Sequence, residues 1–370
     1  MNIMLWCGYQ NPFWNKQTWL DEGIGGSEYC VLKLAENLSK FGHNVTVSGD
    51  VIEGTFSGVN YIHYSNLMLN RGPLGIKGQN KKVYDHYHVV IASNYINYFK
   101  HLDEVGITFD KSFFWIHNGY FYAWYRGSLL PNNGKNYLTD KRLTKIVGVS
   151  EFHKPILREY FKGFNYTPQQ LDTYIHSIDN AIDINDWVDI STTQHKIDGQ
   201  IIWSSSPDRG LDLILDNWLE FKKHRPDLTL KICCPPYSKD WFKNDVSNLE
   251  GVEWLGSLNP HNLRLEIARS EYWIYASEYV ETYCISALEM MMGKVKILTN
   301  GTGNIKHLIN NNELGEKCNL DTKIIIQKLV RDRDDKVFAY RWLKKVGKAR
   351  IWAEQQNWVK RAKEWEELCK

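Results

Sequence analysis

The sequence predicts an α/β protein of two doubly wound domains, each a parallel sheet wrapped by helices. Short apolar stretches alternate with helical stretches, and this pattern restarts after a polar segment at 182–199. The chain has 370 residues, more than one hydrophobic core usually organises. We expect a first domain at 1–185, a second at 186–345 and a C-terminal helix or helix pair at 346–370. Two such domains in tandem imply a cleft between them.

The first domain is predicted from its apolar strands and one glycine-rich turn. A strand at 2–7 precedes the turn at 23–26, after which apolar residues recur at helical spacing until Gly42. Ser27 is the expected N-cap of this helix. Further strands are expected at 45–48, 89–92, 112–116 and 146–149.

The second domain repeats the alternation of strand and helix. Its expected helices lie at 211–223 and 285–292, and its expected strands at 201–203, 229–233, 252–255, 272–275 and 296–298.

Composition narrows the class of protein. Hydrophobic residues make up 43% of the chain and charged residues 24%, which argues against a disordered or fibrous chain. The net charge is only +2 and the basic residues are dispersed, so we expect no nucleic-acid partner. The seven cysteines are odd in number and lack CxxC spacing, which favours free thiols in a reducing compartment.

The chain shows no segment typical of secretion or membrane insertion. Its first residues turn polar too quickly for a signal peptide, and no run of about eighteen apolar residues occurs. We therefore expect a cytoplasmic protein without a transmembrane segment. A peripheral contact with a membrane stays open, and so does the oligomeric state.

Glu281 and Glu289 are the most informative pair of residues. They flank the point where a strand of the second domain ends and a helix begins, which is the edge where parallel sheets bind ligands. A helix start near Tyr283 and Cys284 would direct backbone amides at an anion such as a diphosphate. Two glutamates at this spacing are, on their own, more often a solvated pair on a helix surface.

The run from Glu281 to Glu289 resembles the E-x7-E signature of retaining GT4-type glycosyltransferases. That resemblance implies the GT-B fold, in which two Rossmann-like domains face a central cleft. It covers nearly the whole chain, because other segments similar to family motifs follow in the expected order: Gly25-Gly26-Ser27-Glu28, Val147-Gly148-Val149-Ser150, Asn180-Ala181-Ile182-Asp183, Ser206-Pro207-Asp208-Arg209-Gly210 and Gly301-Thr302-Gly303.

The resemblance implies a donor site in the second domain. Glu281 would bind hydroxyls of the donor sugar, Glu289 the ribose hydroxyls, and Arg209 the diphosphate, whose leaving charge a guanidinium stabilises. Further contacts to sugar and phosphates would come from Thr282, Tyr283 and Cys284. The nucleotide base would lie near Pro235, Gly256 and Leu258.

The sequence departs from the family pattern at two places. Ser204 stands where many members carry a second basic residue, so the hydroxyls of Ser204, Ser205 and Ser206 would share the phosphate contact. A family glutamate after the later glycine pair is missing, and Lys306 lies nearby.

Two features of the first domain are also candidates. His117 follows the apolar run 113–116 and resembles a family histidine close to the transferred sugar, where a neutral or charged imidazole would orient a hydroxyl. The alternative is a hydrogen-bonded structural histidine. Gly25, Gly26 and Ser27 let a loop approach a phosphate or acceptor, or form a plain tight turn.

Two other patterns are assigned no function. His86-Tyr87-His88 places two imidazoles on one strand face without a third ligand. Asp332-Arg333-Asp334 has the spacing of a metal-binding D-x-D motif, but we expect a solvated helix or loop there.

The leading hypothesis is a retaining glycosyltransferase of carbohydrate biosynthesis. It would move a sugar from a nucleoside diphosphate sugar, with GDP-mannose favoured, to a carbohydrate, glycan or other hydroxyl acceptor. It would need no cofactor and no metal, since the nucleotide sugar is a substrate. The alternatives are a sugar-nucleotide epimerase of the same fold and an inactive carbohydrate-binding or scaffold protein.

Overall fold

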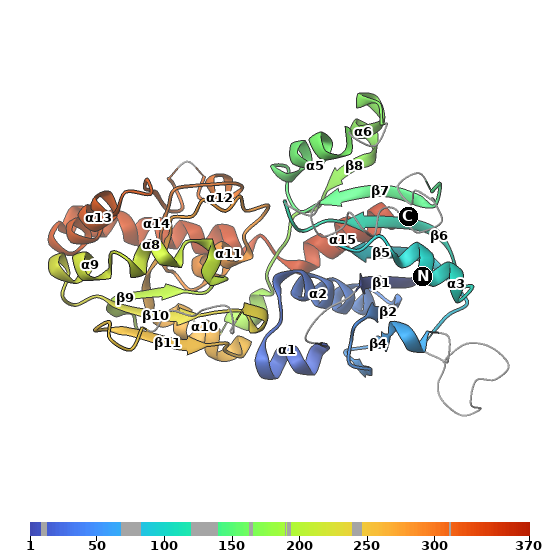
Figure 1. The fold of residues 1–370 in the computed structure, drawn as a ribbon, viewed down its shortest axis with the longest axis horizontal. Coiled ribbons are helices and arrows are strands. Elements are labelled where there is room, and N and C mark those ends of the chain that lie inside the picture. The colour runs from blue at the N-terminus through green and yellow to red at the C-terminus, as the bar shows by residue number, and fades with distance from the viewer. Residues whose placement is uncertain are drawn as a thin grey trace. The chain divides into compact units, whose positions relative to one another are not determined.

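The chain folds into two compact units. A computed structural model describes residues 1–8, 13–67, 83–119, 140–162, 166–188, 190, 194–238, 246–310 and 312–370. Unit 1 contains residues 1–18, 26–180 and 358–370, and unit 2 contains residues 19–25 and 181–357 (Figure 1). The first predicted boundary, at 185, thus lies a few residues beyond the observed division. The boundary predicted at 346 lies inside a helix of unit 2.

Unit 1 is built on a sheet of eight strands in its described part. Their order is β3-β4-β2-β1-β5-β6-β7-β8, and every neighbouring pair is parallel except β3 with β4. The strands are β1 (Asn2–Gly8), β2 (Asn44–Gly49), β3 (Gly54–Phe56), β4 (Val59–His63), β5 (His86–Ser93), β6 (Thr108–Trp115), β7 (Leu143–Gly148) and β8 (Ile175–Ser177).

Helices cover the unit 1 sheet, so its central strands are apolar on both faces. Ile3 to Cys7 of β1 are at most 1% exposed. The helices are α1 (Lys16–Glu22), α2 (Gly26–Lys40), α3 (Tyr98–Glu104), α5 (His153–Phe161), α6 (Pro168–Tyr174) and α15 (Trp358–Cys369). Of these, α1 passes into unit 2 at Trp19.

The C-terminal helix α15 belongs to unit 1 and packs against α2. Trp365 is fully buried, and its ring meets the ring of Trp115 edge-on at 5.1 Å. The chain reaches unit 1 again only at Trp358, because α14 (Lys336–Glu354) continues through the predicted start at 346 within unit 2.

The prediction that Ser27 is the N-cap of α2 was wrong. The helix begins at Gly26, so Ser27 lies in its first turn, and the Ser27 hydroxyl donates to the Glu28 carboxylate at 3.0 Å. Ser27 therefore does not cap the helix.

Unit 2 contains a parallel sheet with the order β11-β10-β9-β12-β13-β14. Its strands are β9 (Ile197–Trp203), β10 (Thr229–Cys233), β11 (Val252–Gly256), β12 (Ser270–Tyr275), β13 (Lys296–Thr299) and β14 (Glu316–Lys317). The chain moves outward from β9 to β11 and then returns to place β12 on the other side of β9. This reversal creates a switch point between β9 and β12, where sheets of this kind bind ligands.

The helices of unit 2 are α8 (Leu211–Leu215), α9 (Trp218–His224), α10 (Pro260–Arg269), α11 (Ile285–Met292), α12 (Ile305–Leu308), α13 (Thr322–Asp334) and α14. The single helix predicted at 211–223 is interrupted. The Asn217 side chain donates to the Leu213 carbonyl at 2.9 Å, which satisfies an end carbonyl of α8 before α9 begins at Trp218.

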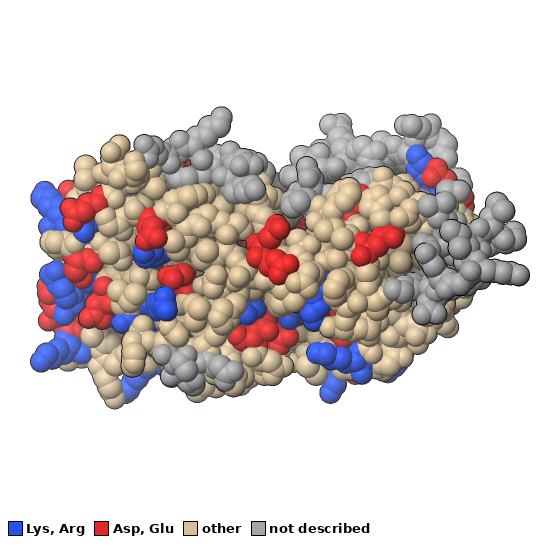
Figure 2. All heavy atoms as spheres, turned by 90° about the horizontal axis from the view of Figure 1, so that it is seen from below, with Lys and Arg blue, Asp and Glu red and all other residues tan. Residues whose placement is uncertain are grey.

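Charges on the face drawn in Figure 2 are mixed in sign. Lys and Arg side chains alternate with Asp and Glu among the residues shown in colour. The residues drawn in colour therefore form no continuous basic surface of the kind a phosphate backbone needs. Within the described ranges, every helix is too short or too polar to cross a lipid bilayer.

The Asp332-Arg333-Asp334 run differs from the expected solvated stretch, because Asp332 is only 4% exposed. Asp332 ends the inward face of α13, on which Ile325 and Leu329 are also buried. Its carboxylate accepts a hydrogen bond from Tyr272 and an ion pair from Lys296. The prediction was wrong for Asp332, because its helical spacing from Ile325 and Leu329 places it on the buried face although its sequence neighbours are charged.

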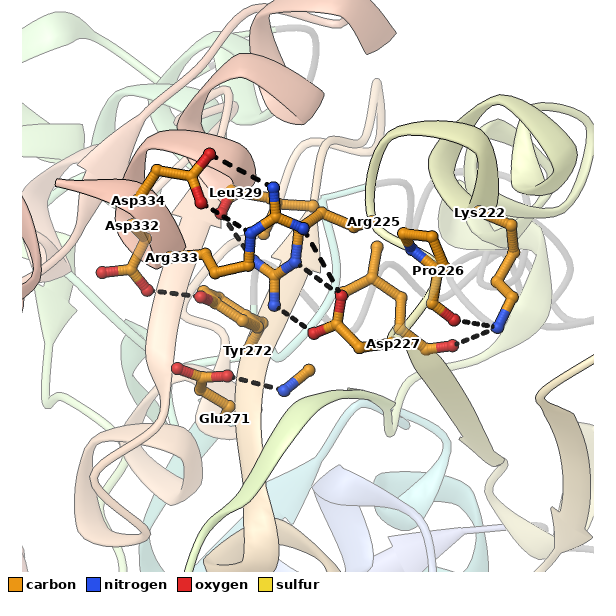
Figure 3. Close-up of polar contacts among 12 residues, drawn as sticks. Lys222, Arg225, Pro226, Asp227, Glu271, Tyr272, Leu329, Asp332, Arg333 and Asp334 are labelled. Carbon is orange, nitrogen blue, oxygen red and sulfur yellow. Dashed lines mark hydrogen bonds and ion pairs between the residues drawn. The ribbon is translucent and has the colours of Figure 1, made fainter.

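This polar cluster lies at the amino ends of the unit 2 strands, opposite the edge that holds the switch point. Lys296, at the start of β13, also pairs with Glu271 at 2.7 Å, and Glu271 accepts from the Gly199 amide at 2.7 Å. Arg225, only 2% exposed, pairs with Asp227 and donates to the Leu329 carbonyl (Figure 3). The cluster therefore holds α13 against the sheet.

We predict that Asp332→Ala lowers the free energy of unfolding by about 3 kcal/mol, because it leaves Lys296 half-paired and the Tyr272 hydroxyl without its acceptor. The urea midpoint, followed by tryptophan fluorescence, measures the loss. Asp334→Ala, two residues along the same helix but on its exposed side, is the matched control and should leave the midpoint unchanged. Equal midpoints for both variants would contradict a structural role for Asp332.

Candidate functional site

The candidate site lies at the carboxyl ends of β9, β12 and β13 in unit 2. Three segments meet there: 204–210 after β9, 276–284 after β12 and 300–304 after β13. The first and second segments are in contact, since Gly210 has a φ of +109° and a Cβ added there would lie 2.9 Å from the Ala276 carbonyl. Glycine at this position allows the loop that carries Arg209 to lie against the end of β12.

The backbone of Glu281 is fixed by the segment after β13. Glu281 forms an isolated parallel bridge with Gly303, and its carbonyl accepts from the Asn304 amide at 2.8 Å. Gly303 has a φ of +73°, and a Cβ there would lie 2.4 Å from the Glu281 carbonyl oxygen. Only glycine permits this approach, so Gly303 sets the position of Glu281.

Glu281 is 5% exposed, and its carboxylate receives two hydrogen bonds on one oxygen. Oε1 accepts from Nη1 of Arg209 at 2.9 Å and from the Tyr275 hydroxyl at 2.6 Å. Within the part of the chain that the structure describes, no side chain or amide donates to Oε2. One oxygen therefore anchors the side chain, and the other can accept from a ligand.

Arg209 presents a partly open guanidinium beside this carboxylate. Its side chain is 26% exposed, and the guanidinium lies 4.3 Å from the ring centre of Tyr279. Burial disfavours the charged form, but the Glu281 carboxylate outweighs it and raises the pKa of Arg209 above its usual value. Among the described residues, the guanidinium of Arg209 donates one hydrogen bond, from Nη1 to Glu281. Its other N–H groups can therefore bind an anion.

Buried serine hydroxyls lie in the loop before Arg209, and we call residues 204–206 the serine loop. Ser206 is 3% exposed, and the hydroxyls of Ser204 and Ser206 are buried without a hydrogen-bond partner among the described residues. Ser205 is also buried, and its carbonyl accepts from the Trp203 indole at 2.8 Å. Buried unpaired hydroxyls are costly, so their presence in one loop is typical of a place that a polar ligand fills.

The start of α11 points the residues after Glu281 at the same region. Cys284 is the N-cap with a left-handed φ of +77°, and its side chain forms no capping hydrogen bond. The Tyr283 carbonyl accepts from the Asn304 side chain at 3.1 Å, which fixes the turn. Thr282, Tyr283 and Cys284 are all buried. An uncapped helix start can donate amides to an anion.

Glu289 lies one to two turns further along α11, near Arg264 and Asp186. Arg264 forms an ion pair with Asp186 at 2.8 Å. Burial raises the pKa of Glu289 to about 7, Arg264 opposes this rise and Asp186 adds to it. The pKa of Glu289 therefore lies near neutral pH.

The residues expected near the base follow β10 and β11. The Cys234 amide donates to the Gly256 carbonyl at 3.0 Å, and Pro235 accepts from the Ser238 amide at 3.0 Å, so the two strand ends are joined. Segment 19–25 lies beside them: the Ser257 hydroxyl donates to the Glu22 carbonyl at 3.1 Å. A Cβ on Gly23 would be 3.2 Å from the carbonyl of Leu258.

His117 and the start of α2 belong to unit 1. His117 is 8% exposed, its amide donates to the Asn94 side chain at 2.9 Å, and its ring lies 4.3 Å from the Trp115 ring centre. Burial, with a smaller contribution from His153, lowers the pKa of His117 to about 3. Of the two protonation states considered from the sequence, the structure favours the neutral imidazole.

The structure thus brings most candidate site residues of unit 2 together, whereas the other candidate residues lie elsewhere in the two units. Arg209, Glu281 and the serine loop lie at the switch point, followed by 282–284 at the start of α11, whereas Glu289 is further along α11. Gly25 belongs to unit 2, and Gly26, Ser27 and His117 to unit 1. A Cβ on Gly26 would meet nothing within 4 Å.

Sequence reasoning missed three residues of the site: Tyr275, Gly303 and Asn304. Tyr275 ends a predicted strand, and an aromatic residue at such a position is more often part of the core. Gly303 was noticed only as part of a motif. Its requirement for glycine depends on the Glu281 backbone, which is distant in sequence.

The histidine pair at 86 and 88 has local partners. The two rings lie 5.8 Å apart, and the ring nitrogens of His86 meet Thr108 and Asp110. Among the described residues, no three His, Cys, Asp or Glu side chains gather as a ligand set.

The fold and the site define a two-domain α/β protein of the GT-B class. The chain aligns over its whole length with Anabaena HepE in complex with UDP and glucose, at 12% identity, TM-score 0.66 and 99% of that chain. It also aligns over its whole length with sucrose-phosphate synthase from Thermosynechococcus elongatus, at 16% identity, TM-score 0.67 and 98% of that chain. Starch synthase IV from Arabidopsis thaliana, bound to ADP and acarbose, is similar at 14% identity and TM-score 0.65, covering 100% and 98% of the two chains.

Residues 204–332 match the family model of the glycosyl transferases group 1. This segment lies within unit 2 and is similar to the glycosyl transferases of that group. The matched segment begins at the serine loop and includes Arg209, Glu281 and Glu289. None of the curated protein sequences matches this chain.

We predict that Gly303→Ala lowers transferase activity on the order of 100-fold, because the new Cβ displaces the Glu281 backbone and misplacement of about 1 Å at a site has effects of this size. Steady-state turnover measures the change. Gly347→Ala in α14 is the matched control, since a Cβ there meets nothing within 4 Å. Similar activity in both variants would contradict the positioning role of Gly303.

We predict that Glu289 makes stability depend on pH. Its folded-state pKa of about 7 exceeds the unfolded value of about 4.3. Its contribution to stability is therefore complete below about pH 4.3 and is lost as pH rises to about 7. As pH rises between these two values, the melting temperature of the Glu289→Gln variant should increase relative to that of the wild type. Above the folded-state pKa, the difference between the two melting temperatures should stay constant. A constant difference from pH 5 to about pH 8 would refute the shifted pKa.

Proposed function

We propose that the chain transfers a hexose from a nucleoside diphosphate sugar to a carbohydrate, glycan or other hydroxyl acceptor, with retention and without a metal. One observation carries the proposal: the Glu281 carboxylate is held by Arg209 and Tyr275 through one oxygen while its other oxygen has no described donor. This arrangement suits a sugar hydroxyl next to a guanidinium that faces a diphosphate.

The proposed diphosphate contacts come from the serine loop, Arg209 and the start of α11. The hydroxyls of Ser204 and Ser206, which lack described partners, would donate to phosphate oxygens and so stand in for the basic residue that many relatives carry. The open N–H groups of Arg209 would stabilise the negative charge that develops on the leaving diphosphate. Thr282, Tyr283 and Cys284 would add contacts at the helix start.

The remaining roles follow from placement. Glu289 would accept hydrogen bonds from the ribose diol, and Pro235, Gly256 and Leu258 would border the base. In unit 1, neutral His117 would orient a hydroxyl of the transferred sugar or acceptor, while Gly25, Gly26 and Ser27 would allow a phosphate or acceptor to approach the backbone. The acceptor proton would pass to a donor phosphate oxygen, because Glu281 is committed to binding.

GDP-mannose is the donor we propose first, and UDP-glucose is the comparison to make, because HepE has been solved with UDP-glucose. Melting-temperature shifts with GDP, UDP and ADP would rank the bases. Donor hydrolysis and transfer, followed by mass spectrometry, would then identify the sugar. A new epimer formed without acceptor would favour the epimerase alternative, and absence of stabilisation by every nucleotide would contradict the proposal.

We predict that Arg209→Lys lowers kcat on the order of 100-fold while the protein stays folded, because an ammonium group cannot replace two guanidinium contacts to phosphate oxygens. Glu281→Gln should reduce kcat comparably, since the amide pairs poorly with both Arg209 and a sugar hydroxyl.

The matched control for these two variants is Glu278→Gln, an exposed glutamate three residues before Glu281. It should keep the wild-type kcat and KM. Full activity of Glu281→Gln, or equal losses in all three variants, would contradict the assigned roles.

A further inference from the structure

Helix α14 has a well-packed inner face. Every buried residue of the helix lies on one side, where it packs on α11 and α13: Phe338, Trp342, Val346, Ala349 and Ala353. These spacings of three and four residues define a single stripe of an α-helix. The opposite side of α14 faces solvent, where the helices of globular proteins usually carry polar side chains.

The outer side of α14 nevertheless carries four large apolar residues. Val337, Tyr340, Leu343 and Ile351 are 63%, 57%, 63% and 62% exposed. At about 100° per residue they fall within one arc opposite the buried stripe. Single exposed apolar residues are common, but four on one helix face are characteristic of an interaction surface.

Cations are interleaved with these apolar residues. Lys336, Arg341, Lys344 and Lys348 are exposed on the same arc. Considering the described ranges alone, none of the four forms an ion pair, and the Lys344 ammonium lies 4.7 Å from the ring centre of Tyr340. Glu354 is the only acidic residue of α14, and it pairs with Arg350. We call these four cations and four apolar residues the outer face of α14.

We propose that the outer face of α14 binds the surface of an anionic lipid bilayer. Apolar side chains on one face of a helix can enter the boundary between headgroups and acyl chains, while flanking lysines and arginines attract anionic headgroups. Both requirements are met by the same arc of α14. The proposal concerns a surface of unit 2 and does not depend on the roles assigned to the donor site.

The charge of the outer face argues against a second copy of this chain as its partner. Two such faces in contact would oppose four unpaired cations to four others, and like charges in an interface are strongly unfavourable. An anionic surface instead complements every one of them. Nucleic acid offers anionic charge too, but no apolar layer for Val337, Leu343 and Ile351.

Vesicle co-sedimentation of the full chain tests the proposal. Vesicles of phosphatidylcholine alone are compared with vesicles of equal parts phosphatidylcholine and phosphatidylglycerol, at low and high salt. We expect binding to the anionic vesicles, weakened by salt, and little binding to the neutral ones. Equal binding to both, or none to either, would overturn the proposal.

Two double variants locate the surface. Lys344→Ala with Lys348→Ala should weaken binding roughly 25-fold, since each cation near an anionic surface contributes about fivefold. Leu343→Ser with Ile351→Ser should weaken binding to a similar or greater extent. Both variants should melt at the wild-type temperature, because the replaced side chains are exposed.

The control is Leu219→Ser with Lys323→Ala, which removes an exposed apolar residue and an exposed cation of unit 2 away from α14. It should bind vesicles like the wild type. Wild-type binding by the α14 variants, or an equal loss in the control, would refute the assignment. So would a dimer in solution that dissociates on Leu343→Ser with Ile351→Ser, or binding to polyglutamate without binding to vesicles.

Discussion

The hydrogen bonds on one oxygen of Glu281 are the interaction on which the unit 2 site depends. Arg209 comes from the loop after β9, Tyr275 from the end of β12, and the backbone of Glu281 is held by the segment after β13. Three neighbouring strand ends are thereby joined through a single carboxylate. A buried carboxylate with a charged partner is costly to disturb, so the site is ordered before any ligand arrives.

Unit 2 concentrates polar groups at both ends of its sheet, but in chemically different forms. At the amino ends, Lys296 and Tyr272 both bind Oδ2 of the Asp332 carboxylate, so that cluster stabilises packing. At the carboxyl ends, the hydroxyls of Ser204 and Ser206 are unsatisfied within the described chain. Paired charges at one edge contribute stability, whereas unpaired donors at the other edge are available to a substrate.

The central strands of both units could be predicted because their residues are apolar on both faces and form continuous runs. The short strands β3, β8 and β14 at the sheet edges, and β4 beside β3, have no such pattern and were missed. Motif order identified Arg209 and Glu281, but their contact with each other and with Tyr275 requires tertiary structure. Local sequence could not show that Asp332 faces inward or that Gly303 must approach the Glu281 backbone, because both depend on neighbours distant in the chain.

Each unit is assembled from segments that are separated in the sequence. The chain passes between them four times, after residues 18, 25, 180 and 357. A fragment 181–357 would lack the segment that covers Ser257 and Leu258, and a fragment 26–180 would lack both β1 and the Trp365 that packs on Trp115. Neither unit is a continuous, exchangeable module. Recombination at one point of the gene therefore cannot transfer a complete unit 2 to another protein.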